Sequence, residues 1–213
     1  MIEEYLKDLE ASKGELLQEM ESLAERNEFP IIGAQCGRRL MILAAAIGAK
    51  KVFEMGSGFG YSTIWFCHAV GPEGMVVHTD GDPNNTSQAK EFVARAGFTD
   101  RARFLTGDAN ELLEQSDEIF DVILIDIDKQ DYPKALEIAV KKLSVGGFIL
   151  THNTKWFSRI VDENDTDPTT EGIREYNRRA FAHPQLATYI DPADDGLGIS
   201  LKLDADIRQT LPI

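Results

Sequence analysis

Two groups of ionisable side chains directly follow hydrophobic runs in this sequence. Asp126, Asp128 and Lys129 come after the apolar run 122–125, and His152 and Asn153 come after the run 145–151. Carboxylates can hold a divalent cation, and a lysine or a histidine can exchange a proton with a substrate. Each residue alone has an ordinary structural explanation, because polar side chains are common where strands end. The two groups therefore suggest chemistry only if the fold brings them together.

A glycine-rich turn supplies the next candidate site. The stretch E-M-G-S-G-F-G-Y-S-T over residues 54–63 lies where a predicted strand turns into a predicted helix. Glycines allow a ligand to approach the backbone closely, and the first turn of a helix offers free N–H groups. The dinucleotide fingerprint G-x-G-x-x-G would require glycine where this sequence has Tyr61. The spacing therefore speaks against NAD, although a G-x-G-x-G loop by itself is weak evidence for any one ligand.

Acidic residues follow two further predicted strands. Asp80 ends the run 75–79, twenty residues after Gly60, and Asp82 follows it closely. A carboxylate at the end of the second strand is where a ribose diol is bound, and Asp80 is the better placed of the two. The stretch 107–109 follows the next strand, at a position suited to an adenine contact.

The elements that must position these residues are short apolar runs alternating with helical patterns. This alternation predicts a doubly wound α/β sheet, in which side chains at the carboxyl ends of the strands face a ligand crevice. The run 122–125 is apolar on both faces, which is typical of a central parallel strand. The predicted strands are residues 51–55, 75–79, 102–105, 122–126, 145–151, 186–190 and 198–203. The predicted helices between them are residues 61–70, 84–96, 109–113, 132–143 and 170–182.

The beginning of the chain predicts a helical cap. Apolar residues recur at helical spacing over residues 2–25, with Gly14 weakening the middle, and a second helix is predicted over residues 34–47. We expect a single domain, with a cap over residues 1–48 and a Rossmann-like core over residues 49–213. The last two strands are predicted to form an antiparallel hairpin.

Composition narrows the function classes. The chain has 213 residues, with 36 acidic and 22 basic side chains and a net charge of −14, which disfavours a nucleic acid or an anionic membrane as partner. No apolar run is long enough to span a membrane, and the acidic N-terminus is unlike a signal peptide. Cys36 and Cys67 lie in apolar surroundings and suggest a reducing compartment. The sequence therefore predicts a cytoplasmic protein.

The loop at residues 54–63 resembles the first motif of class I S-adenosylmethionine-dependent methyltransferases. More narrowly, the chain resembles the O-methyltransferase family that includes catechol and caffeoyl-CoA O-methyltransferases. The resemblance covers nearly the whole chain and includes Tyr176-Asn177 and Asp195-Gly196-Leu197. It implies a Rossmann-like methyltransferase fold, with a mostly parallel seven-stranded sheet and an antiparallel C-terminal strand, and it implies a homodimer.

The resemblance also assigns roles to residues. It implies that the region of Gly56 and Ser62 holds the methionine carboxylate, that Asp80 binds the ribose, and that Asp108 and Ala109 lie beside the adenine. Carboxylates at Glu54 and Asp126 would favour a cationic sulfonium. The full set expected to bind S-adenosylmethionine is Glu54, Gly56, Ser57, Gly58, Gly60, Ser62, Asp80, Gly81, Asp108, Ala109 and Asp126.

For the reaction itself, the resemblance implies that Asp126 is a metal ligand and Lys129 the general base. The family has Asp-Asn where this sequence has His152-Asn153. We therefore expect a divalent metal (Mg, Mn or Ca) at Asp126, His152 and Asn153, with one negative charge fewer than in the family. Three outcomes stay open: a borderline metal such as Mn²⁺ or Zn²⁺, weak metal binding, or no metal with His152 as a base or substrate contact.

The resulting hypothesis is transfer of a methyl group from S-adenosylmethionine to a hydroxyl of a small, catechol-like aromatic acceptor, assisted by a metal and Lys129. Trp156, Phe157 and Tyr176 are candidates for the walls of the acceptor pocket. Two alternatives remain: a non-catalytic or metal-independent protein that binds S-adenosylmethionine, and an NAD(P)-dependent Rossmann oxidoreductase.

Overall fold

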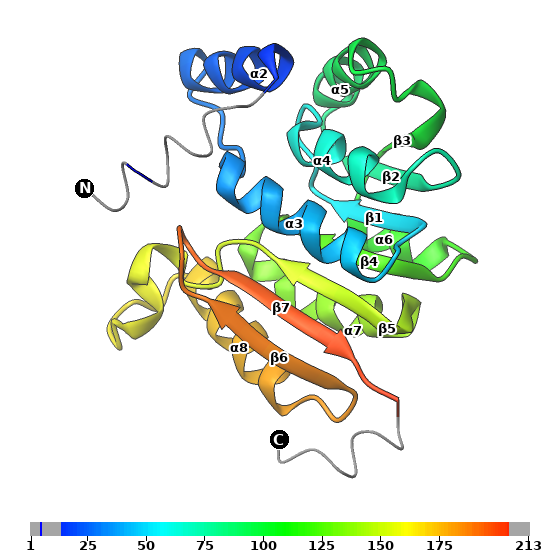
Figure 1. The fold of residues 1–213 in the computed structure, drawn as a ribbon. Coiled ribbons are helices and arrows are strands. Elements are labelled where there is room, and N and C mark those ends of the chain that lie inside the picture. Colours follow the sequence, from blue (N-terminus) through cyan, green and yellow to red (C-terminus); the bar gives the residue numbers. More distant parts are fainter. Residues whose placement is uncertain (1–4, 6–13, 205–213) are drawn as a thin grey trace.

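A computed structural model describes Tyr5 and residues 14–204. At its centre lies a seven-stranded sheet with the order β3-β2-β1-β4-β5-β7-β6 (Figure 1). The strands are β1 (Lys51–Met55), β2 (Met75–Asp80), β3 (Ala102–Thr106), β4 (Phe120–Ile125), β5 (Leu143–Thr151), β6 (Leu186–Asp191) and β7 (Leu197–Lys202). The first five are parallel, and β7 pairs antiparallel to both β5 and β6. The predicted Rossmann-like fold with antiparallel C-terminal strands is confirmed.

Helices cover both faces of the sheet. They are α2 (Glu15–Arg26), α3 (Ala34–Ala46), α4 (Tyr61–Val70), α5 (Pro83–Arg95), α6 (Ala109–Gln115), α7 (Tyr132–Lys142) and α8 (Pro168–Ala182), with short 3-10 turns at η1 (Thr99–Arg101), η2 (Lys129–Asp131) and η3 (Trp156–Val161). Residues of α2–α5 form one buried cluster with one face of the sheet, and residues of α6–α8 form a second with the other face (Figure 1). Central strands are therefore apolar on both sides, as β4 shows, where Val122 and Leu124 belong to the first cluster and Ile123 and Ile125 to the second.

The N-terminal cap differs from the prediction. Gly14 has an extended backbone (φ −60°, ψ 151°) and is the N-cap of α2, so the prediction of one helix continuing through Gly14 is wrong at that residue. Ile2, Leu6 and Leu9, which supported the first half of that helix, lie outside the described residues. No helix in the described part of the chain is long and apolar enough to cross a membrane.

Close backbone packing joins α8 to the turn that carries Lys129. A Cβ atom at Gly172 would lie 2.2 Å from the carbonyl oxygen of Lys129 and 2.7 Å from the Cα of Gln130. Because both are backbone atoms, they cannot move aside as the end of a flexible side chain could. The absence of a side chain at Gly172 therefore sets how closely α8 approaches η2.

We expect Gly172→Ala to lower the free energy of unfolding by about 1–2 kcal/mol. Overpacking costs about 1–3 kcal/mol, and this exceeds the gain of up to about 1 kcal/mol that alanine brings to a helix interior. Urea denaturation measures the difference. Gly81→Ala is the control, because Gly81 is exposed, has no positive φ, and a Cβ there meets no atom within 4 Å. A Gly172→Ala protein as stable as the wild type would contradict the packing argument.

Candidate active site

The carboxyl ends of the parallel strands open into two adjoining cavities. The larger has a volume of about 780 Å³ and reaches from the glycine loop to Lys129 and His152. The smaller has a volume of about 180 Å³ and lies beside the start of α6. Residues lining both are Gly56, Asp80, Gly81, Ile127 and Asp128. One crevice therefore contains most of the sites that the sequence predicted separately.

The glycine loop depends on two close approaches. Gly56 has φ +80°, and a Cβ there would lie 2.2 Å from the carbonyl oxygen of Asp126. Gly60 has φ +92°, and its Cβ would lie 2.9 Å from the Cβ of Ala89. Positive φ and these contacts both require glycine. Gly60 lines neither cavity, so what it supports is the placement of α4 against α5.

Asp80 joins the glycine loop to the second strand. Its Oδ2 accepts the N–H of Gly58 at 2.8 Å, and its Oδ1 accepts the N–H of Asp82 at 2.9 Å and the side-chain amide of Asn85 at 3.0 Å. These bonds hold the carboxylate at the border of the two cavities. Asp82, the second candidate in the sequence, instead caps α5 by accepting the N–H of Asn84 at 2.8 Å.

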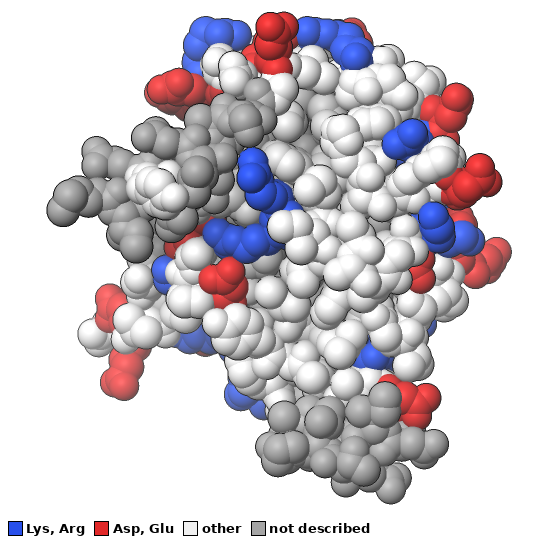
Figure 2. Space-filling model, viewed as in Figure 1, with Lys and Arg blue, Asp and Glu red and all other residues white. Residues whose placement is uncertain are grey.

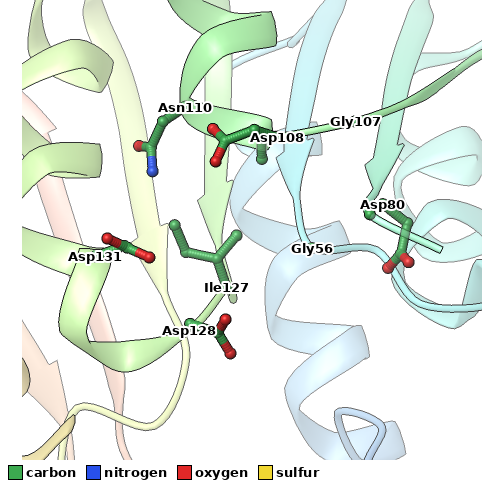
Figure 3. Close-up of a pocket in the computed structure, with 10 residues that line it drawn as sticks. Gly56, Asp80, Gly107, Asp108, Asn110, Ile127, Asp128 and Asp131 are labelled. Atoms are coloured by element: carbon green, nitrogen blue, oxygen red, sulfur yellow. The ribbon is translucent and has the colours of Figure 1, made fainter.

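The smaller cavity has a polar rim (Figure 3). Asp108 and Asn110 lie on one side of it and Asp128 and Asp131 on another, with Asp80 beyond Gly56. Asp108 caps α6, since its Oδ1 accepts the N–H of Glu111 at 2.9 Å. Asn110 is only 3% exposed, and its Oδ1 has no hydrogen-bond partner among the described residues. Asn110 is not among the residues predicted from the sequence, although it directly follows the predicted adenine contact at 107–109.

At the other end of the crevice, the ends of β4 and β5 bring three ionisable residues together. The Nζ of Lys129 lies 2.8 Å from Oδ1 of Asp126, and Nδ1 of His152 lies 3.2 Å from Oδ2 of the same carboxylate. Burial alone would raise the pKa of Asp126, but Lys129 and His152 outweigh burial and hold this pKa well below its usual range. Asp126 is therefore a carboxylate with a cation or hydrogen-bond donor on each oxygen.

Asn153 is directed toward the hairpin turn. Its Nδ2 donates to Oδ2 of Asp195 at 2.8 Å, and the other oxygen of Asp195 accepts the N–H of Phe157 at 2.6 Å. Trp156 and Phe157 line the larger cavity, as predicted, but Tyr176 does not. Tyr176 is 1% exposed and shares a 2.5 Å hydrogen bond with Thr151, so its expected place in the acceptor pocket is corrected to the core.

Glu54 also lines neither cavity. Its side chain is fully buried, and its Oε2 accepts the hydroxyl of Thr63 at 2.6 Å, which directs the carboxylate toward α4. Burial raises the pKa of Glu54 to about 7, and the hydroxyls of Ser62 and Thr63 offset only part of this effect. The expectation that Glu54 contacts a bound cation in the crevice is corrected, because its carboxylate is fully buried and accepts a hydrogen bond from Thr63 of α4.

The donor set around Asp126 is a poor fit to a hard divalent cation. Such cations prefer several oxygen ligands, and often more than one carboxylate. Here Lys129 and His152 already face both oxygens of Asp126, and the amide nitrogen of Asn153 donates to Asp195. In the described part of the chain, no three residues of the types His, Cys, Asp and Glu are grouped to hold a metal. The residues present therefore do not fit the metal that the resemblance implied.

Comparisons with known proteins show which family this chain resembles. A family model described as O-methyltransferase matches residues 7–203. A catechol O-methyltransferase from Niastella koreensis is 32% identical over 182 residues, which cover 83% of this chain and 82% of the relative. One from Mycobacterium tuberculosis is 32% identical over 176 residues, 80% of each chain. The structure of an O-methyltransferase from Bacillus cereus in complex with SAH has a TM-score of 0.87 and 27% identity, covering 94% of this chain and 96% of that one.

The raised pKa of Glu54 predicts a pH dependence of stability. Between the ordinary pKa of 4.5 and the folded value of about 7, the unfolded chain loses the proton first, so rising pH favours unfolding. At about 1.4 kcal/mol per pKa unit, the loss across this range is about 3 kcal/mol. We expect Glu54→Gln to remove this dependence in urea denaturation between pH 5 and pH 8. Glu114→Gln, on the exposed side of α6, is the control and keeps the wild-type dependence. Equal pH dependence in the wild type and Glu54→Gln would show that Glu54 is not the cause.

Proposed function

This chain belongs to the O-methyltransferase family, and on that premise we propose that it transfers the methyl group of S-adenosylmethionine to a hydroxyl of a small aromatic acceptor. The reaction type and the cofactor come with the family. The acceptor class and the residue roles are the proposal. The observation that carries it is the continuity of the larger cavity, which extends from Gly58 and Asp80 to Lys129 and His152. Methyl donor and acceptor can therefore meet in one crevice.

We propose that the cofactor lies across both cavities. The adenine would occupy the smaller one, beside Asp108, Ala109 and Asn110, where the unpartnered amide oxygen of Asn110 can accept a hydrogen bond from an amino group. The ribose would lie at Asp80 and Gly81, on the border of the two cavities. The methionine end would lie against the glycine loop, at Gly56, Ser57, Gly58 and Ser62.

The rest of the larger cavity suits an aromatic acceptor. Its walls include the apolar side chains of Phe29, Ile31, Ile32, Trp156 and Phe157. Such walls bind a flat apolar ring, while a few polar groups fix its orientation. In this cavity the polar groups include Asp126, Lys129 and His152, so the acceptor hydroxyl would lie beside Lys129.

Lys129 and Asp126 would act on the acceptor oxygen together. Lys129 Nζ donates to Oδ1 of Asp126 at 2.8 Å and to the carbonyl oxygen of Ile127 at 3.2 Å, which leaves one N–H for a ligand. A cation held there favours the negative charge that develops on a reacting hydroxyl. The resemblance makes Lys129 the general base, but the ion pair with Asp126 favours electrostatic stabilisation instead. No step is assigned to a metal, because the residues present do not fit one.

The alternatives differ in what they require. A non-catalytic protein would bind S-adenosylmethionine but would not turn over any hydroxylated acceptor. The oxidoreductase hypothesis is not supported, because the chain belongs to the methyltransferase family and has Tyr61 where the NAD fingerprint needs glycine.

A small-molecule acceptor, no nucleic-acid partner, a homodimer and a cytoplasmic location remain part of the proposal. Figure 2 shows one face of the molecule, where acidic and basic side chains are scattered along the rim and a small basic group lies left of the centre, beside an acidic side chain. A nucleic acid would call for a longer basic stripe. The two cysteines, Cys36 and Cys67, are buried and unpaired, which suits a reducing compartment.

We expect Asp80→Ala to weaken binding of S-adenosylmethionine about 10- to 100-fold in isothermal titration calorimetry. A hydrogen bond to a charged group contributes about 1.5–3 kcal/mol, and about 1.4 kcal/mol is a factor of ten in affinity. Asp100→Ala, exposed on η1, is the control and should bind like the wild type. If the wild type bound NAD but neither S-adenosylmethionine nor S-adenosylhomocysteine, the proposed function would be wrong. Unchanged affinity in Asp80→Ala would reject only the ribose role.

A further inference from the structure

We propose that His152, oriented by Asp126, is the general base of the methyl transfer, and that the acceptor therefore needs only one hydroxyl and no divalent metal. This inference rests on the proposed function. It starts from the residue at which this chain departs from the family pattern and from the way in which the structure places that residue.

Asp126 orients the imidazole of His152. His152 Nδ1 lies 3.2 Å from Oδ2 of Asp126, and it is the ring nitrogen that has a hydrogen-bond partner among residues 14–204. Because Asp126 is a carboxylate, it accepts a hydrogen bond from an N–H at Nδ1, and a ring with its single proton on Nδ1 carries its lone pair on Nε2. A carboxylate that fixes a histidine tautomer in this way is the arrangement that makes histidine a base in hydrolytic triads.

Hydrogen bonds hold the backbone of His152 in place on both sides of the residue. The backbone N–H of His152 donates to the carbonyl oxygen of Ile125 at 3.1 Å, and its carbonyl oxygen accepts the hydroxyl of Tyr132 at 3.1 Å. Its side chain is only 13% exposed, yet His152 lines the larger cavity. The imidazole is thus held at the wall against which the acceptor would bind.

Lys129 has different surroundings from His152 and suits a different role. Lys129 is ion-paired with Asp126, and its Nζ lies 5.0 Å from the centre of the Tyr132 ring and 5.7 Å from that of Trp156. The amino group of Lys129 is thus engaged by a carboxylate and two electron-rich rings, which suits it to stabilise an oxyanion. His152, the other side chain that contacts Asp126, is then the candidate for the proton acceptor.

The reaction then balances without another component. A lone pair of the acceptor oxygen forms a bond to the methyl carbon, and the carbon–sulfur bond breaks with its electron pair remaining on sulfur. The sulfonium becomes a neutral thioether, and the hydroxyl proton moves to Nε2 of His152. The imidazolium is stabilised by Asp126 and later releases its proton to solvent.

This mechanism defines the substrate class. A metal-dependent mechanism selects acceptors with two neighbouring oxygens, which chelate the cation. A histidine base beside an ammonium needs a single oxygen, so we infer that phenols with one hydroxyl are substrates as readily as catechols. The apolar walls of the cavity supply affinity for the ring in either case.

The first test needs no acceptor. With S-adenosylhomocysteine bound, ¹⁵N NMR of the histidine rings should show His152 protonated on Nδ1, and Asp126→Asn should change this tautomer. His68, exposed on α4 with its ring 4.6 Å from that of Phe98, is the internal control and should not change.

Calorimetry with MnCl₂ should show no binding to the wild type, whereas His152→Asp, which supplies a second carboxylate, should bind Mn²⁺. A proton on Nε2 in the wild type, or Mn²⁺ binding that His152→Ala abolishes, would overturn the proposal.

The second test measures turnover with S-adenosylmethionine on matched catechols and phenols, such as caffeic acid and 4-coumaric acid, before and after treatment with EDTA. We expect the wild type to methylate both acceptors and to be unaffected by EDTA. His152→Ala should lose about 10²- to 10⁴-fold in kcat, the usual contribution of a general base, with unchanged binding of S-adenosylmethionine. His68→Ala should keep full activity.

The outcomes separate the two proposals. Loss of wild-type turnover in EDTA, activity on catechols alone, or full activity in His152→Ala would overturn the histidine mechanism while leaving the methyltransferase intact. No binding of S-adenosylmethionine or S-adenosylhomocysteine would overturn the proposed function. If neither acceptor is turned over, the NMR measurement still decides whether Asp126 holds the proton of His152 on Nδ1. The Mn²⁺ measurement still decides whether the site binds a metal.

Discussion

The contact between Gly56 and the carbonyl of Asp126 is the constraint on which the site depends. The N–H of Asp126 donates to the carbonyl oxygen of Met55 at 2.9 Å, and a Cβ at Gly56 would lie 2.2 Å from the Asp126 carbonyl oxygen. This contact falls between β1 and β4, where the strand order reverses and an open α/β sheet forms its ligand crevice. Because no side chain separates the two strand ends, the loop proposed for the cofactor and the residues proposed for proton transfer share one wall.

Much of this arrangement could be predicted from the sequence because it depends on local patterns. Residues 51–55 and 61–70 are strand and helix as predicted, and the apolar run in β4 identified the central strand. Because β4 and β5 are adjacent and parallel, the residues that follow their carboxyl ends, Asp126 and His152, lie close together. The prediction failed at Gly14, where periodicity continued across a glycine that starts a helix instead of interrupting one.

The wall of the larger cavity near the hairpin could not be predicted in the same way. Asn153 and Asp195 are 42 residues apart, and their hydrogen bond depends on the pairing of β5 with β7. Trp156, Phe157 and Ser158 all have positive φ, which local propensity disfavours for residues other than glycine. Asp195 holds Phe157 through its backbone N–H, so tertiary contacts outweigh local preference at this wall. The direction of the Glu54 side chain could not be predicted either, because a sequence motif fixes the position of the backbone but not the direction of the side chain.

The charge balance of the cluster formed by Asp126, Lys129 and His152 depends on the residue at position 152. Asp126 and Lys129 carry opposite charges and lie 2.8 Å apart, so these two residues balance each other without a further ion. An aspartate at position 152 would add an unpaired, largely buried negative charge, and burying such a charge is costly unless a cation accompanies it. A divalent cation would be that partner. On the proposed mechanism, His152 in this position makes an added cation unnecessary. The same substitution, histidine for the family's aspartate, would then change both the proton chemistry and the electrostatic need for a metal.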